Sequence, residues 1–189
     1  STVALVKKNI YDIYRPFCTG AWINDKTILT ARHCVTNDDE SVDIGTVINF
    51  QPYNDFSPQG PTENAYFAYV SGYSKTSDLA MLTSIDDVSH DTARIYSGDI
   101  YAGIKLQIVG HPIGMNWSHS DSQVMQVRIS HFPFVNQKVI QVVHHIYFGN
   151  SGGGMFDEDE GKLVGIASYV RLDGDFVVAG FFCHRDEII

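Results

Sequence analysis

The chain has 189 residues, and a chain of this length removes roughly 70% of its unfolded surface from water, which is enough for a sizeable core. Its 44% hydrophobic and 19% charged residues are typical of a globular protein, and the formal net charge of −9 disfavours nucleic acid or an anionic membrane as a partner, because both attract a basic face. No apolar run approaches the roughly 18 residues that a membrane-spanning helix needs.

Short apolar runs follow one another along the chain, separated by clusters of Gly, Pro, Asn and Asp. They are rich in Val, Ile, Phe and Tyr, and several alternate; Val127 and Ile129 share one face of their run while polar residues share the other. Such runs are typical of short β-strands, and no long stretch has a helical period. The sequence therefore predicts an all-β fold, a sandwich or a barrel. The runs lie at 21–31, 67–73, 78–85, 104–110, 124–132, 138–148, 162–170 and 176–183.

Two connectors interrupt these runs. Residues 50–64 contain three of the six prolines and predict a long surface loop in the first half of the chain. Residues 86–99 are the expected bridge between the two halves. The first residues, 1–14, lack the long apolar core of a signal peptide, so we expect Ser1 to be a processed N-terminus or the start of a unit released from a longer precursor.

The stretch YFGNSGGGMF, from Tyr147 to Phe156, surrounds a single serine, Ser151, with glycines. Because glycine tolerates positive φ and a close backbone approach, a Gly-x-Ser-Gly turn exposes the hydroxyl and can aim backbone N–H groups at one point. Donors fixed where negative charge develops during acyl transfer form an oxyanion hole. A glycine-rich hairpin with an inert serine is the alternative that this stretch alone leaves open.

A serine hydroxyl is a weak nucleophile at neutral pH and needs a base. Among the eight histidines, His33 in TILTARHC follows an apolar strand and a turn of small residues. Asp78 in SDLAML precedes an apolar run, where a carboxylate can be held partly buried and can fix the tautomer of an imidazole. Singly, each has a structural interpretation, as a structural histidine or a turn aspartate.

Taken together, TARHC, SDLAML and GNSGG, in the order His, Asp, Ser, resemble the motifs of the chymotrypsin-like (trypsin-like) serine proteases over nearly the whole chain. The short interval between Asp78 and Ser151, with IVGHPIG and LVGIAS, is similar to the compact HtrA-like, glutamyl-endopeptidase and viral members. The resemblance implies two packed six-stranded antiparallel β-barrels with little helix, an N-terminal one in 1–90 and a C-terminal one in 91–189. It also implies a serine endopeptidase that acts on a protein or peptide and needs no metal or organic cofactor.

The same resemblance assigns roles to the site residues. Ser151 attacks the scissile carbonyl, His33 carries the proton to the leaving amine, and Asp78 orients His33. The backbone N–H groups of Gly149 and Ser151 form the oxyanion hole. Asn150 stands where zymogen-activated members carry an aspartate that pairs with a freed N-terminal amine, so we expect a site that is competent without N-terminal cleavage.

The resemblance also places a substrate pocket. Ser168, Val170 and Gly180 match positions of its strands, and His145, followed by Ile146, holds the position that often sets primary specificity. No aspartate stands there, which argues against Lys or Arg as the preferred residue. A small or medium apolar residue, or Glu or Gln bound by the histidine, are the alternatives, and His145 could also be a residue at the edge of the core.

Cys18 and Cys34 lie at the spacing of a disulfide that, in the family, pins the histidine strand; two reduced thiols are the alternative. The third cysteine, Cys183, is then expected in the core rather than as a second nucleophile. A disulfide indicates an oxidising compartment. We therefore expect a secreted or periplasmic enzyme, with a viral protease that cuts its own polyprotein precursor in the host cell as the alternative.

Two other function classes remain. A protease-fold binding module without catalysis is the alternative, although such proteins typically lose the serine, the histidine or the glycine turn. A histidine-based metal protein is disfavoured, because His119 and His131 lack a compact ligand spacing and His144 and His145 are adjacent rather than one helical turn apart. We expect no metal site.

Overall fold

The computed structural model describes residues 1–52, 65–110, 118–134, 136–142 and 150–188. In this part of the chain almost all regular structure is strand, and the helices are two single 3-10 turns, η1 (Arg32–Cys34) and η4 (Arg185–Glu187). The predicted all-β class with little helix is confirmed. None of the helices described is long and apolar enough to cross a membrane.

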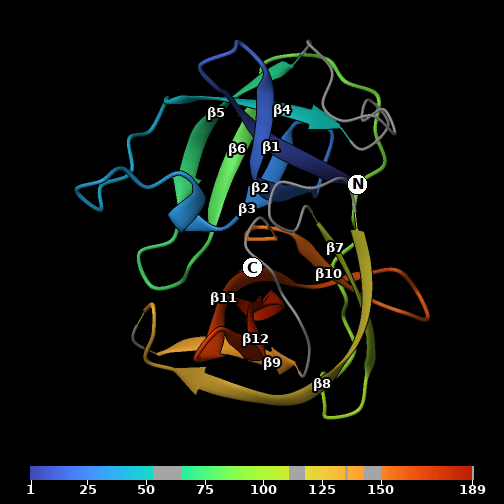
Figure 1. Cartoon of the computed structure of the whole chain (residues 1–189). Helices are drawn as coiled ribbons and strands as arrows, with labels where there is room; N and C mark the ends of the chain where they lie inside the picture. Colours follow the sequence, from blue (N-terminus) through green and yellow to red (C-terminus); the bar gives the residue numbers. More distant parts are fainter. Residues whose placement is uncertain (53–64, 111–117, 135, 143–149, 189) are drawn as a thin grey trace.

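The first half of the chain closes into an antiparallel barrel, the upper one in Figure 1. Its core is built on large buried side chains, with Trp22 packed edge-on against Phe50 at 5.5 Å between ring centroids. The apolar runs missed β1, β4, most of β2 and, in the second barrel, β10 (Gly154–Asp157). Strand β1 is buried at five consecutive residues and so does not alternate. Residues 50–52, expected in the long surface loop, are buried in β4 instead. In the order β1-β2-β3-β6-β5-β4 the strands are β1 (Thr2–Lys8), β2 (Tyr14–Trp22), β3 (Thr27–Thr30), β6 (Ala80–Ser84), β5 (Tyr66–Tyr73) and β4 (Val47–Pro52).

The second half forms another closed antiparallel barrel, the lower one in Figure 1. Leu106, Ile140, Met155 and Phe182 fill its centre. The predicted architecture of two six-stranded barrels is therefore confirmed. In the order β10-β11-β12-β9-β8-β7 the strands are β10 (Gly154–Asp157), β11 (Leu163–Asp173), β12 (Phe176–His184), β9 (Gln137–Val142), β8 (Ser118–Ser130) and β7 (Lys105–Gly110).

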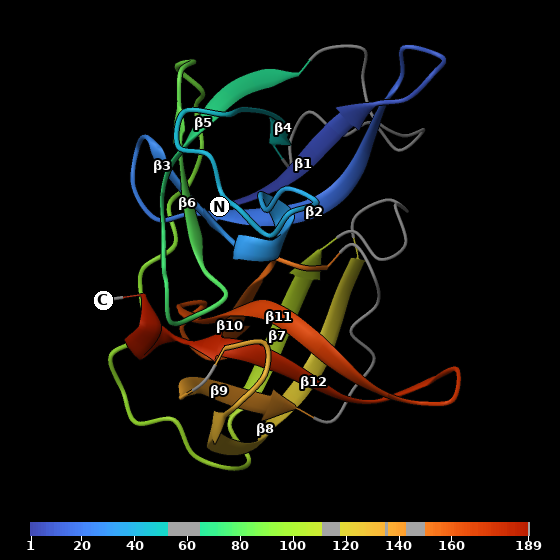
Figure 2. The ribbon, with the colours of Figure 1, turned by 90° about the vertical axis from the view of Figure 1, so that its left-hand side faces the viewer.

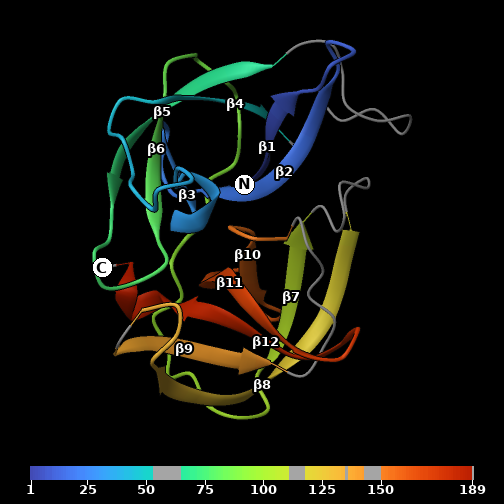
Figure 3. The same cartoon turned by 60° about the vertical axis from the view of Figure 1, so that its left-hand side comes forward.

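A buried seam joins the barrels and positions the site. One apolar cluster takes Leu29 from the first barrel and Val109 and Ile166 from the second. The connection between β6 and β7 is tied to both barrels, because Ala93 N donates to Trp22 O at 2.7 Å and the isolated bridge of Ile95 pairs with Leu163 of β11. Figures 2 and 3 show η1 on the side of the first barrel that faces β10 and β11.

Candidate active site

His33 and Asp78 meet on the first barrel although 45 residues separate them. Strand β3 ends at Thr30 and the chain turns into η1, which carries His33, while Asp78 lies just before β6, the strand paired with β3. Asp78 Oδ1 accepts the backbone N–H of His33 at 2.9 Å, and Oδ2 lies 2.7 Å from His33 Nδ1. Because both carboxylate oxygens bind the same residue, the imidazole ring is fixed in tautomer and orientation.

The Asp78 carboxylate is buried, with 1% of the residue exposed. Burial by itself would raise the pKa of this carboxyl, but the hydrogen bonds and charge of His33 and the hydroxyl of Ser168, which donates to Oδ2 at 2.7 Å, outweigh it and lower the pKa. Asp78 is therefore ionised at neutral pH, as an orienting partner for a cationic imidazole must be. Ser168 comes from β11, so the second barrel already contributes to this pair.

Ser151 lies in a tight turn that enters β10 of the second barrel. Its carbonyl accepts the N–H of Thr19 from the first barrel at 2.8 Å, and Gly152 N donates to Ala167 O at 2.9 Å. Gly152 has φ +80°, and a Cβ there would overlap the Thr19 carbonyl and the Thr30 hydroxyl. Only glycine fits this position, because its backbone conformation and the contact with the first barrel both exclude a side chain.

A pocket of about 730 Å³ opens where the two barrels meet, and His33, Asp78 and Ser151 all line it. No hydrogen bond between Ser151 Oγ and His33 is formed among the residues described. Arg32, Thr36 and Glu40 of the first barrel also line the pocket, and the wall from the second barrel is mostly apolar. That wall consists of Phe132, Pro133, Phe134, Ala167, Tyr169, Val170 and Leu172.

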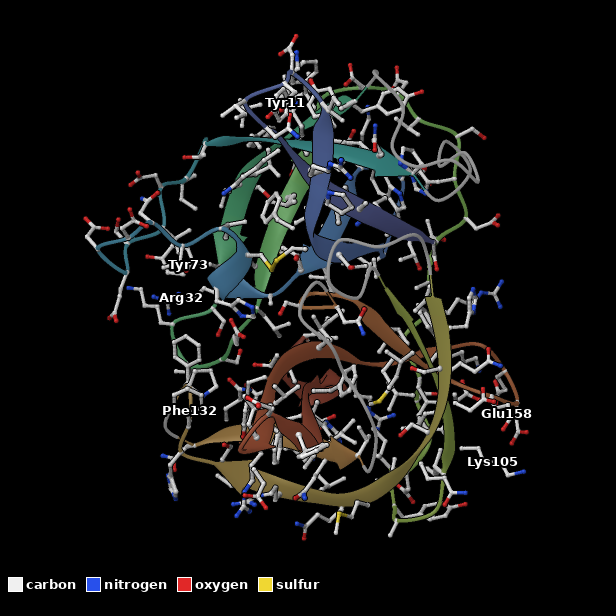
Figure 4. All side chains as sticks on the ribbon, viewed as in Figure 1. Tyr11, Arg32, Tyr73, Lys105, Phe132 and Glu158 are labelled. Atoms are coloured by element: carbon white, nitrogen blue, oxygen red, sulfur yellow. A yellow bond between two sulfur atoms is a disulfide. The ribbon has the colours of Figure 1, made fainter. Side chains whose placement is uncertain are left out.

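Arg32 spans the rim of this pocket beside His33. Its guanidinium carbon lies 4.9 Å from the ring centroids of both Tyr73 in the first barrel and Phe134 in the second, and Nη1 donates to Ser74 O at 3.2 Å. Figure 4 shows Arg32 and Tyr73 above Phe132, on the edge where the barrels face one another. Cation–π contacts on two rings hold the pocket wall to the first barrel.

Most of the chain matches a known protein family. The model of the trypsin-like peptidase domain matches residues 18–166, a span that contains His33, Asp78 and Ser151. The chain belongs to the trypsin-like peptidase family. It is thus a serine peptidase of the chymotrypsin-like fold, as the sequence motifs predict. A comparison with curated proteins finds no significant match.

Solved structures share the fold of this peptidase at low sequence identity. The active form of the Rv3671c protease from M. tuberculosis has a TM-score of 0.75 and 18% identity, over 100% of this chain and 77% of that one. The HtrA-type protease AlgW with a tripeptide has a TM-score of 0.74 and 18% identity, over 98% of this chain and 56% of that one. AlgW with a decapeptide has a TM-score of 0.72 and 19% identity, over 92% of this chain and 50% of that one.

The predicted pocket residues of the peptidase differ in where they lie. Ser168 and Val170 line the pocket, whereas Gly180 is buried in β12, paired with Val142 and Val170, and is not among the lining residues. The predictions for His145, Ile146 and the oxyanion donor Gly149 fall outside the described residues.

The predicted disulfide between Cys18 and Cys34 is present, and Cys183 is free and buried. The bridge ties β2 to η1, the element that carries His33, and Cys34 Sγ lies 3.6 Å from the Ser151 carbonyl. The ligand atoms of Cys18, Cys34 and His33 lie within 4.8 Å of one another, but both sulfurs are bonded to each other and are not available as thiolates. This cluster therefore serves to brace η1.

Reduction of this bridge is expected to lower the stability of the peptidase by about 3 kcal/mol, the value for a loop of this size in the chain-entropy model. For a chain of this length that corresponds to a fall in Tm of roughly 6–12 °C. Thermal melts with and without a phosphine reductant test this. The Tm of Cys183→Ala should fall on reduction as much as that of the unmodified chain. The double variant Cys18→Ala/Cys34→Ala should have a low Tm that the reductant does not change. An unchanged melt after three free thiols have been counted would contradict the prediction.

Three contributors to the site could not be predicted from the sequence pattern: Arg32, the wall at residues 132–134, and Gln137. Arg32 is adjacent to His33, yet only the packed barrels bring Tyr73 and Phe134 to its two faces. Gln137 immediately precedes the apolar run 138–148 and begins β9 (Gln137–Val142), but its contact with Asp78 at the seam has no signal in the pattern.

Proposed function

We propose that the chain is an endopeptidase that cleaves peptide bonds through a Ser151–His33–Asp78 triad and an acyl-enzyme intermediate. The observation that carries the proposal is the two-point bond between His33 and the buried Asp78, on the same pocket as Ser151. His33 Nδ1 is bonded to the carboxylate, which leaves Nε2 as the nitrogen to accept a proton from Ser151 Oγ. A neutral serine becomes a competent nucleophile only with such a base.

In this mechanism Ser151 Oγ adds to the scissile carbonyl as its proton passes to His33, and Asp78 stabilises the resulting imidazolium. His33 then protonates the leaving amine, and water repeats the sequence on the acyl-enzyme to release the acid. The proposed oxyanion hole uses the N–H groups of Gly149 and Ser151. The glycine-only backbone at position 152 supports this, because it folds the turn around Ser151.

The substrate we propose is an extended peptide lying along β11. The apolar wall supports side chains of small to medium apolar residues, and the absence of an aspartate at the position of His145 argues against Lys or Arg at the cleaved bond. Crystals of AlgW with a tripeptide and a decapeptide support peptide binding on this fold. The Cys18–Cys34 bridge supports an oxidising compartment, and we propose secretion or the periplasm.

We also propose that the site is active without an N-terminal ion pair. Asn150, directly before Ser151, is buried and carries no charge, and its Oδ1 has no hydrogen-bond partner among the residues that the structure describes. A neutral amide cannot form the ion pair with an amine that an aspartate forms. Extension of the N-terminus should therefore leave the nucleophile reactive.

The test is intact mass after incubation with a fluorophosphonate probe, applied to the 189-residue chain and to a chain with an added N-terminal peptide. We expect one adduct on each, at similar rates, and peptide mapping should place it on Ser151. An adduct that forms only after the extension is trimmed would contradict zymogen independence. No adduct on either chain would favour a protease-fold binding module instead.

A further inference from the structure

A closed ring of hydrogen bonds joins the backbone N–H and C=O groups of Asp78 to Gln137 and Cys183. Asp78 N donates to Gln137 Oε1 at 2.9 Å, Gln137 Nε2 donates to Cys183 Sγ at 3.3 Å, and Cys183 Sγ lies 3.6 Å from Asp78 O. All three residues are buried, with Gln137 and Cys183 at 0% exposure. The ring thus satisfies both the donor and the acceptor of the Asp78 backbone without water.

The ring crosses between the barrels. Asp78 precedes β6 of the first barrel, whereas Gln137 begins β9 and Cys183 lies in β12 of the second. Ser151 also belongs to the second barrel. The ring therefore links the residue that orients His33 directly to the barrel that carries the nucleophile.

We infer that Gln137 is a positioning residue of the peptidase: with Cys183 it fixes the backbone of Asp78 against the second barrel and so sets the alignment of His33 with Ser151. The inference rests on the proposed triad. Gln137 is not among the residues that line the pocket, so it acts through Asp78 rather than on substrate.

The side chains of Gln137 and Cys183 have the donors and acceptors that the ring requires. A glutamine side chain offers one acceptor and one donor, and the ring uses both. Burial, followed by the charge of Asp78, raises the pKa of the Cys183 thiol, so the sulfur keeps its proton and acts as a donor to Asp78 O. An apolar residue at position 137 would leave the Asp78 N–H unpaired in the seam. A buried unpaired donor lowers the free energy of unfolding unless the backbone shifts to find another partner.

Gln137→Met keeps the length of the side chain and removes both hydrogen bonds. We expect kcat for a peptide substrate to fall by about 10- to 100-fold, the effect of a displacement of about 1 Å in a catalytic geometry, with KM changed less than about twofold. In an Asp78→Ala background the same substitution should change kcat less than about twofold, because the residue it positions is gone. Gln51→Met, which alters a fully buried glutamine of β4, is the matched control and should leave kcat unchanged in both backgrounds.

Two further measurements separate positioning from general stability. The low-field NMR resonance of the His33 Nδ1–H proton should broaden or shift in Gln137→Met and stay unchanged in Gln51→Met, measured where both variants have the same folded fraction. If Gln137→Met does not fold, two variants at position 183 test the inference instead. Cys183→Ala should lower kcat severalfold. Cys183→Ser, which keeps a hydrogen-bond donor and acceptor, should retain most of the kcat of the unmodified chain.

An unchanged kcat in Gln137→Met, an equal loss in both backgrounds, or equal kcat in the two position-183 variants would overturn the inference. These outcomes differ from a failure of the triad itself. In that case the unmodified chain would be inert to the fluorophosphonate probe, and the proton resonance would still report whether the ring positions Asp78.

Discussion

Ser151→Ala is expected to lower kcat/KM by about a millionfold and to leave the fold intact, on the scale of nucleophile removal in serine proteases. In the proposed mechanism this hydroxyl forms the acyl-enzyme, so its removal leaves the mechanism without its nucleophile. The turn itself depends on the Gly152 backbone and on the Ser151 carbonyl bond to Thr19, which an alanine retains. Stability should therefore change little.

The measurement is cleavage of a casein-type substrate with active-site titration, beside a thermal melt. Ser71→Ala is the control, because its hydroxyl donates to Met81 O on the first barrel, away from the pocket. It should keep full activity. Residual activity within a hundredfold of the unmodified chain, after trace contaminants are excluded by probe labelling, would remove Ser151 from the proposed mechanism.

Asp78→Asn is expected to lower kcat by about 10⁴-fold with nearly unchanged geometry. Three donors converge on this carboxylate: the backbone N–H and Nδ1 of His33, and the hydroxyl of Ser168. An amide has one oxygen to accept from them, and its NH₂ faces a donor. The imidazole must then present the wrong tautomer to Ser151.

Asp157→Asn is the matched control for this variant. Asp157 is also a buried aspartate, 5% exposed, and it accepts the N–H groups of Glu160 and Lys162 in a turn after β10. Its replacement should lower Tm and leave kcat within about threefold, since Asp157 is not among the described residues that line the pocket. Activity of Asp78→Asn within tenfold of the unmodified chain would show that His33 is oriented by another group.

The all-β class and the cysteine pair could be predicted because each depends on information close in sequence or on a family motif. Short runs of β-branched residues between glycine and proline clusters indicate strands whatever their partners in the fold are. Cys18 and Cys34 lie at the two ends of one short segment of chain, 16 residues apart. The motifs TARHC, SDLAML and GNSGG named His33, Asp78 and Ser151, and the structure places all three on one pocket.

The rest depends on contacts between distant segments. Strand β1 has no alternation because both of its faces are covered: Val3 and Leu5 pack into the barrel core, and Ala4 and Val6 pack into a second apolar cluster with Tyr14. Gln137 meets Asp78 across 59 residues, and Arg32 meets Phe134 across the seam. Which side chains meet there is decided by strand register and by how the barrels dock, and neither leaves a periodic signal in the chain.

The anchoring across the seam is reciprocal. The carbonyl of Ser151, on the second barrel, is held by Thr19 of the first, while Asp78, on the first, is held by Gln137 and Ser168 of the second. Each half of the molecule therefore completes the reactive group carried by the other. A chain cut in the connection between the barrels would recover hydrolysis only when its fragments reassociate, so that turnover itself would serve as a reporter of complementation.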